Sequence, residues 1–134
     1  VAFAKTFETN DETVDLLIHN AGCMALPFTK TADGDEQQQQ VNYLSVVLLT
    51  ELLKPRLNAG GRVVAVSSSA HKMGATLPDD AKFLDALQQY VAAPSVETYD
   101  KWMAYAVAKS AVIVYMNALD TELKEAKGVR CFSV

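Results

Sequence analysis

The chain contains little cysteine, no excess of positive charge and no long apolar run among its 134 residues. Its two cysteines, Cys23 and Cys131, lie far apart and fit no spacing of metal ligands. We therefore predict no metal site and two reduced, buried thiols in an intracellular, cytoplasmic protein. A formal net charge of -4 at pH 7 argues against nucleic acid as a partner. We also expect neither a membrane span nor a signal peptide in these residues.

The composition is that of a soluble globular domain, with half of the residues hydrophobic and about a fifth charged. A length of 134 residues gives room for one domain with a real core. The chain begins inside a helical pattern, without methionine, and stops inside an apolar run. We expect residues 1–134 to be a single, partial domain of a larger fold.

Short apolar runs alternate with helical patterns along the chain. The runs lack the polar-apolar alternation of half-exposed strands, so they predict strands buried on both faces, as in a parallel sheet. The predicted strands are residues 15–18, 62–66 and 129–134, and the predicted helices are residues 1–8, 35–57 and 102–127. This order of elements predicts an α/β fold with a parallel sheet.

Small and polar residues follow the first two predicted strands. Asn20-Ala21-Gly22 follows the first strand, and Ser67-Ser68-Ser69 follows the second. Ligands of open α/β sheets bind at the carboxyl ends of the strands, where small residues let them approach the backbone. A serine hydroxyl there can donate to a substrate oxygen. The plainer interpretations are a strand-to-loop turn and a serine that caps local backbone.

The helix predicted at 35–57 is rich in apolar residues, and its stretch 46–49 is apolar almost all round, so we expect burial on two sides. Asn42 stands out, either as a hydrogen-bonded core amide or as a polar group that points into a site. The glutamines at 37–40 are predicted to form a solvated helix start, and Ala59, Gly60 and Gly61 to end the helix. The predicted buried face consists of Val41, Leu44, Leu48, Leu52 and Leu53.

Tyr105 and Lys109 lie four residues apart at the start of the helix predicted at 102–127. This spacing holds a phenol and an ammonium side by side on one helical face. A free phenol has a pKa of about 10, which a nearby cation lowers, so such a tyrosine can act as a general acid or base. By itself the pair is a weak signal, because a partly exposed tyrosine near a solvated lysine is the more common meaning.

The same helix carries apolar residues on two faces, and Gly128 is predicted to end it. The second face is covered either by a neighbouring helix of this chain or by a partner subunit in a homo-oligomer. The first face comprises Tyr105, Lys109, Val112, Met116, Leu119 and Leu123, and the second comprises Val107, Ala111, Val114 and Ala118.

A long connection, residues 70–100, separates the second strand from this helix. Such insertions are often lids or binding loops, and the plainer alternative is a surface helix on the domain edge. His71 is a lone histidine here, without a second histidine or a carboxylate at metal-ligand spacing. The connection is predicted to contain a short helix that starts at Pro78 and Asp79, with one face formed by Phe83, Leu84, Leu87, Tyr90 and Val91.

The order of Asn20-Ala21-Gly22, Asn42, Ser68 and Tyr105-x-x-x-Lys109 resembles the short-chain dehydrogenase/reductase family over nearly the whole chain. The resemblance implies a Rossmann-like, doubly wound parallel sheet and NADP or NAD as cofactor. It implies that Tyr105 is the catalytic acid/base, that Lys109 lowers its pKa and binds the nicotinamide ribose, and that Asn42 holds a water in the proton relay. Ser68, preferred to Ser67, would position the substrate oxygen, and Asn20-Ala21-Gly22 would line the cofactor.

The chain departs from the family pattern in several ways. The glycine-rich loop and the strands that choose between NAD and NADP are not among these residues, so the sheet is expected to be incomplete at its N-terminal half and at its C-terminus. Ser45 stands where many members have glycine. Ser68 and Tyr105 are 37 positions apart, more than is usual. Members that resemble retinol dehydrogenases carry such an insertion, which favours a bulky, apolar carbonyl or alcohol substrate.

Two functions follow from these features. The first is an oxidoreductase that transfers a hydride between a nicotinamide cofactor and a carbonyl or alcohol carbon. The second is a catalytically inactive fragment or scaffold that keeps the motifs but lacks the loop that binds the cofactor. A glycine-rich loop encoded before Val1 would favour the enzyme.

Overall fold

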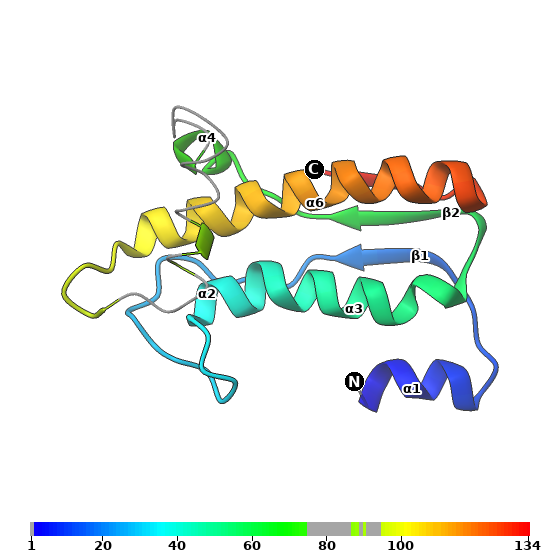
Figure 1. Ribbon diagram of the computed structural model, residues 1–134, viewed down its shortest axis with the longest axis horizontal. Helices are drawn as coiled ribbons and strands as arrows, with labels where there is room; N and C mark the ends of the chain where they lie inside the picture. The colour runs from blue at the N-terminus through cyan, green and yellow to red at the C-terminus, as the bar shows by residue number, and fades with distance from the viewer. Residues whose placement is uncertain (1, 75–86, 89, 91–94) are drawn as a thin grey trace.

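The computed structural model describes residues 2–74, 87, 88, 90 and 95–134. It contains a parallel sheet in the order β1-β2-β3, formed by β1 (Val14–His19), β2 (Leu57–Ala65) and β3 (Arg130–Ser133). A helix, α1 (Ala2–Thr9), precedes β1. The α/β class and the parallel sheet predicted from the sequence are thus confirmed, and Figure 1 shows the chain passing from helix to strand in the predicted order.

The second strand begins five residues earlier than predicted, because the glycines do not end the preceding helix. That helix ends in a short 3-10 turn, η2 (Lys54–Arg56), and β2 starts directly afterwards. Gly60 has a φ of +74°, and a Cβ on Gly61 would lie 2.9 Å from the carbonyl oxygen of Asp15. Pairing with β1 shifts register at this point. The two glycines therefore form a bulge inside the strand, where the backbones approach closely.

The two main helical segments match their predicted positions. The first is continuous through α2 (Gln37–Gln39), a π-helical turn η1 (Gln40–Leu44) and α3 (Ser45–Leu53). The second is α6 (Lys101–Lys127), whose first turn is capped by the carboxylate of Asp100, which accepts from the backbone N–H groups of residues 102 and 103. Gly128 ends α6 with a φ of +66°, as the sequence predicts.

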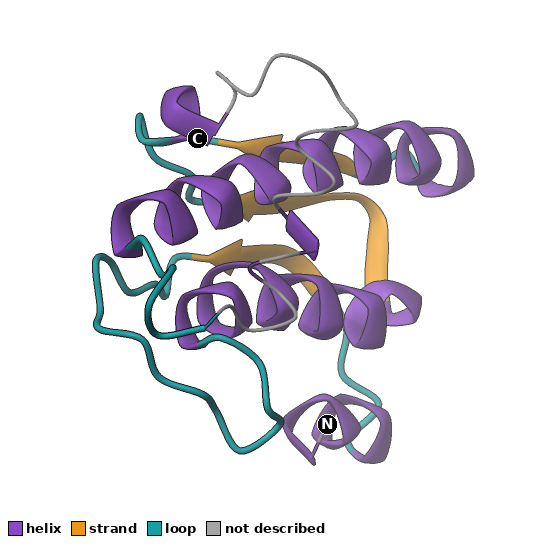
Figure 2. Ribbon diagram, turned by 60° about the vertical axis from the view of Figure 1, so that its left-hand side comes forward, coloured by secondary structure: helices purple, strands orange, loops and turns teal. Residues whose placement is uncertain are grey.

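Helices α3 and α6 pack over one face of the sheet, as Figures 1 and 2 show. On the opposite face Leu16, Ile18 and Phe132 are exposed, so the described part of the chain leaves this face largely uncovered. The prediction that the first strand is buried on both faces is therefore wrong for Leu16 and Ile18. The core between the helices and the sheet includes Val46, Val63, Ala65, Val112, Met116, Leu119 and Cys131.

The buried face of the helix from 37 to 53 differs from the predicted one. Leu48 is 52% exposed, and of the five apolar residues predicted to be buried only Leu53 is. Polar residues occupy this face, and hydrogen bonds satisfy part of their capacity. The Thr50 hydroxyl donates to the Val46 carbonyl at 2.7 Å, whereas the Oε1 atoms of Gln38 and Gln39 are buried without a hydrogen-bond partner among the described residues. The buried residues are Gln38, Gln39, Asn42, Val46, Thr50 and Leu53.

Helix α6 buries the first predicted face, including Lys109, Met116 and Leu123. The second predicted face of α6 is only partly buried. Val107 and Ala111 are buried within the chain, whereas Val114 and Ala118 are exposed. By length and composition alone α6 could cross a membrane, whereas the sequence predicts no membrane span. However, 61% of the most apolar 18-residue stretch of α6 is buried against the rest of the chain. It is therefore the central core helix of this fold.

Part of the connection at 70–100 also belongs to the described structure. Leu87 and Tyr90 pack against Ala104, Val107 and Tyr99 near the start of α6. This packing explains the burial of Val107 without a partner subunit. Most of the short helix predicted from Pro78 lies outside the described residues.

Candidate active site

The Lys109 side chain is buried beneath the carboxyl end of β2. Its Nζ donates to the Val66 carbonyl oxygen at 2.7 Å and lies 5.8 Å from the centroid of the Tyr105 ring. Burial lowers the pKa of this ammonium, since the low-dielectric surroundings disfavour its charged form. The predicted pair is thus brought together on one face of α6, with the half-buried phenol of Tyr105 beside a cation that the strand end holds in place.

Asn42 lies in the π-helical turn η1 and binds the loop that follows β1. Its Oδ1 accepts from the Cys23 backbone N–H at 2.9 Å, and its Nδ2 donates to the Cys23 carbonyl oxygen at 2.8 Å. The amide is therefore hydrogen-bonded at both ends, the first of the two interpretations that the sequence allowed. Wide π turns recur at functional sites, and here the turn carries a predicted site residue.

Gly22 lies beside the side chains of both Asn42 and Lys109. A Cβ at this position would lie 2.9 Å from the Oδ1 of Asn42 and 3.6 Å from the Nζ of Lys109. A side chain would therefore press on Asn42, and the bare backbone keeps the space beside Lys109 open. The end of β1, the turn η1 and α6 meet at this point.

The two candidate serines face different partners. The Ser67 hydroxyl donates to the Lys109 carbonyl oxygen at 3.0 Å, so its proton is committed to α6. The Ser68 Oγ instead accepts from the Ala70 backbone N–H at 3.2 Å. Within the described residues the Ser68 hydroxyl donates to no acceptor, so it keeps its capacity to donate.

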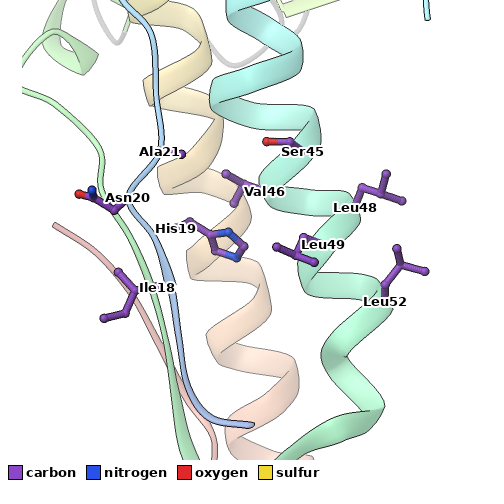
Figure 3. A pocket seen from close by; sticks show the side chains of 9 residues that line it. All are labelled: Ile18, His19, Asn20, Ala21, Ser45, Val46, Leu48, Leu49 and Leu52. Carbon is purple, nitrogen blue, oxygen red and sulfur yellow. The ribbon is translucent and has the colours of Figure 1, made fainter. Parts of the chain in front are cut away.

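Asn20 and Ala21 line a separate cavity of about 350 Å³ between β1 and α3. Figure 3 shows His19 pointing from the strand toward the helix, whereas Ile18 points to the other side. The Nε2 of His19 lies 2.8 Å from the Thr50 Oγ1, whose own proton goes to Val46, so the imidazole donates. The turn Asn20-Ala21-Gly22 is thus shared between this cavity and the space beside Lys109.

Burial and nearby charges also act on the thiol in the loop after β1. The pKa of Cys23 is raised, first by burial and then by the Glu36 carboxylate, while Lys109 opposes the shift. The thiol therefore stays protonated over a wider range of pH than a free cysteine.

Sequence reasoning missed the polar residues that join α2 to the start of α6. The Glu36 carboxylate is buried and accepts from the backbone N–H groups of Gln38 and Gln39 and from the Tyr99 hydroxyl. The prediction of a solvated helix start is wrong, since Gln38 and Gln39 are 0% exposed. In the sequence, the acidic residue Glu36 directly before the glutamines could have indicated a helix N-cap.

Comparisons with known proteins agree with this architecture. The family model for short chain dehydrogenases matches residues 1–77. The chain is 38% identical to human retinol dehydrogenase 11 and 36% identical to human retinol dehydrogenase 12, in both cases over 99% of this chain. These alignments cover 38% and 39% of the two relatives, so the chain spans about two fifths of their length.

Solved structures show the same fold. An uncharacterised protein from Mycobacterium paratuberculosis superposes with a TM-score of 0.73 at 34% identity, over 97% of this chain and 44% of that one. A short chain dehydrogenase from Burkholderia cenocepacia, crystallised with NADP, superposes with a TM-score of 0.60 at 21% identity, over 96% of this chain and 43% of that one. The fold is that of the Rossmann-type α/β proteins. The chain belongs to the short chain dehydrogenase family.

Proposed function

We propose that the complete protein is an oxidoreductase that transfers a hydride between NADP or NAD and a carbonyl or alcohol carbon of a small molecule. The observation that carries the proposal is the buried ammonium of Lys109, held by the Val66 carbonyl beside the Tyr105 ring. The site thus holds a cation beside a tyrosine that is placed to act as a general acid or base. Family membership supports the same chemistry.

The residues near Lys109 fit the nicotinamide end of such a cofactor. An ammonium has three donors, and one of them is used on Val66, which leaves others for ribose hydroxyls. Gly22 keeps the adjoining backbone free of a side chain. When bound, the cofactor supplies or accepts the hydride. The cavity lined by Asn20 and Ala21 lies at the same carboxyl edge of the sheet, where this class of fold binds its ligands.

The chain's own residues would manage the proton and the geometry. Tyr105 would give its phenolic proton to the substrate oxygen in reduction and take it back in oxidation. The Ser68 hydroxyl would donate to that oxygen and hold it near Tyr105. Asn42 would fix the Cys23 backbone and so the loop beside Lys109, and the water that the family resemblance assigns to Asn42 stays a prediction.

We further propose a bulky, apolar substrate. Phe28, from the loop after β1, contacts Tyr99 with ring centroids 5.3 Å apart, and Tyr90 lies 6.3 Å from Tyr99. These rings form an aromatic cluster near the first turns of α6. The insertion between Ser68 and Tyr105 and the similarity to retinol dehydrogenases 11 and 12 support the same class of substrate.

The test is the substitution Tyr105→Phe in the complete protein. The ring keeps its packing, so folding and NADPH binding should persist, while turnover of a long-chain or polyene aldehyde should fall by about 10²–10⁴-fold, as expected for loss of an acid/base. Wild-type turnover in this variant would falsify the proposed role. A complete protein that folds but binds neither NADPH nor NADH would instead support the non-catalytic scaffold.

A further inference from the structure

The sequence singles out His71, and the proposed chemistry leaves this residue without a role. It begins the short helix α4 (His71–Gly74), three residues after Ser68. Helix α4 packs along α6, which carries Tyr105 and Lys109. His71 is therefore placed between the candidate serine and the candidate tyrosine helix.

Three hydrogen bonds hold Ser68 in the turn that leads to His71. The Ser68 carbonyl oxygen accepts from the His71 backbone N–H at 3.0 Å and from its ring Nδ1 at 2.6 Å. Because a carbonyl can only accept, Nδ1 must carry a proton. The Ser68 Oγ accepts from the Ala70 N–H, which leaves the hydroxyl proton for another acceptor. The carbonyl is thus fixed by the imidazole, and the hydroxyl is oriented as a donor.

The other side of His71 is attached to α6. The Ser110 hydroxyl lies 3.1 Å from the His71 carbonyl oxygen and 3.0 Å from the Ala106 carbonyl oxygen, so it bridges α4 and its own helix. Ser110 follows Lys109 directly and is buried. A short hydrogen-bonded path therefore runs from Ser68 through His71 to the turn of α6 that carries Lys109.

We propose that His71 is a positioning residue that sets the Ser68 hydroxyl relative to Tyr105 and Lys109; this rests on the proposed function. A serine that donates to the substrate oxygen must stand within hydrogen-bond distance of the same oxygen that Tyr105 protonates. A misplacement of about 1 Å can cost about 10²-fold in rate. The Nδ1–H bond to the Ser68 carbonyl fixes the backbone from which that hydroxyl projects.

The test compares His71→Asn with His71→Leu in the complete protein. Asparagine places an amide N–H at the same number of bonds from Cα as Nδ1, so it can donate to the Ser68 carbonyl, whereas leucine cannot. We expect His71→Leu to lower kcat by at least about tenfold and His71→Asn to keep it within about threefold. NADPH affinity, read by nicotinamide fluorescence, should stay unchanged in both variants.

A double-variant cycle separates positioning from general structure. If His71 acts through Ser68, adding His71→Leu to Ser68→Ala should cost no further activity, because the group it positions is already absent. Additive losses, equal losses in the Asn and Leu variants, or wild-type kcat in His71→Leu would overturn the inference. If His71→Leu does not fold, His71→Gln, whose amide lies one bond further out, replaces it and should show the loss that Asn avoids. Wild-type activity in Ser68→Ala would instead contradict the proposed function at Ser68.

Discussion

The Gln39 side chain donates to the carbonyl oxygen of Ala104 at 2.7 Å, on the residue that precedes Tyr105. Gln38 makes equivalent bonds, to the Lys101 carbonyl at 2.9 Å and to the Tyr99 hydroxyl at 2.7 Å. Two adjacent glutamines thus attach α2 to the first turns of α6. Because Asn42 follows in the same helical segment, these bonds also set its position relative to Tyr105.

We therefore expect Gln39→Glu to destabilise the complete protein and to reduce its activity. The substitution keeps the shape but turns a donor into an acceptor that faces a buried carbonyl, which should lower the free energy of unfolding by about 1–3 kcal/mol. Urea denaturation measures this change. Gln37→Glu is the matched control, since Gln37 is only half-buried and a negative charge in the first turn of a helix is favourable. Equal stability of the two variants would contradict the role of Gln39.

The two serines should respond differently to removal of the hydroxyl. Ser68→Ala removes the uncommitted donor, so kcat should fall by about 10²-fold or more with little change in stability. Ser67→Ala removes a bond to the Lys109 carbonyl, so it should cost about 1 kcal/mol of stability and much less activity. Steady-state kinetics and thermal unfolding of both variants test the assignment. A larger loss of activity in Ser67→Ala would mean that the other serine contacts the substrate.

His19 should make stability depend on pH. Burial lowers the pKa of its imidazole, so the unfolded state takes up a proton at a higher pH than the folded state. The contribution of the neutral ring is fully present above the unfolded pKa, about 6.5, and is lost as pH falls toward the folded pKa. His19→Gln keeps a donor for Thr50 but does not titrate. Its melting temperature should therefore fall less than that of the wild type between pH 7 and pH 5.

Self-association can be tested at the exposed part of the second face of α6. Val114 is 57% exposed, whereas Ala111, one turn earlier, is buried within the chain. If a homo-oligomer forms through this side of α6, Val114→Arg should shift the complete protein toward monomers in sedimentation velocity. Thr9→Arg, on the exposed end of α1, is the control and should leave the profile unchanged. An unaltered profile in the Val114 variant would place any interface elsewhere.

Features set by contiguous residues were predictable from the sequence. The strand at 15–18, the long helix and its end at Gly128 all follow from local apolar spacing and the conformational freedom of glycine. The meeting of Tyr105 and Lys109 was predictable as well, because four residues make about one helical turn. The proximity of Lys109 to Gly22 followed from the general rule that sites lie at the carboxyl ends of parallel strands.

Features set by distant partners were not predictable. Gln38 and Gln39 look solvent-facing in a local pattern, but their acceptors on Lys101 and Ala104 lie 63 and 65 residues further along the chain. The apolar pattern likewise selected Leu48 for burial, whereas the sheet side of the helix carries Thr50, which His19 satisfies. The spacing of apolar residues therefore does not predict the buried face of a helix where polar side chains find hydrogen-bond partners in the interior.

The π-helical turn from Gln40 to Leu44 holds one residue more than the α-helical turn it replaces. Elsewhere in a helix, deletion of one residue turns everything that follows by about 100° and brings the wrong face to the core. Within this turn, a deletion would restore regular α-helical spacing and leave Gln39 facing α6 and Val46 facing the core. Such a deletion would break the two hydrogen bonds between the Asn42 side chain and the Cys23 backbone. One residue can therefore be removed at this turn without loss of the fold. The loop beside Lys109 would, however, no longer be held in place.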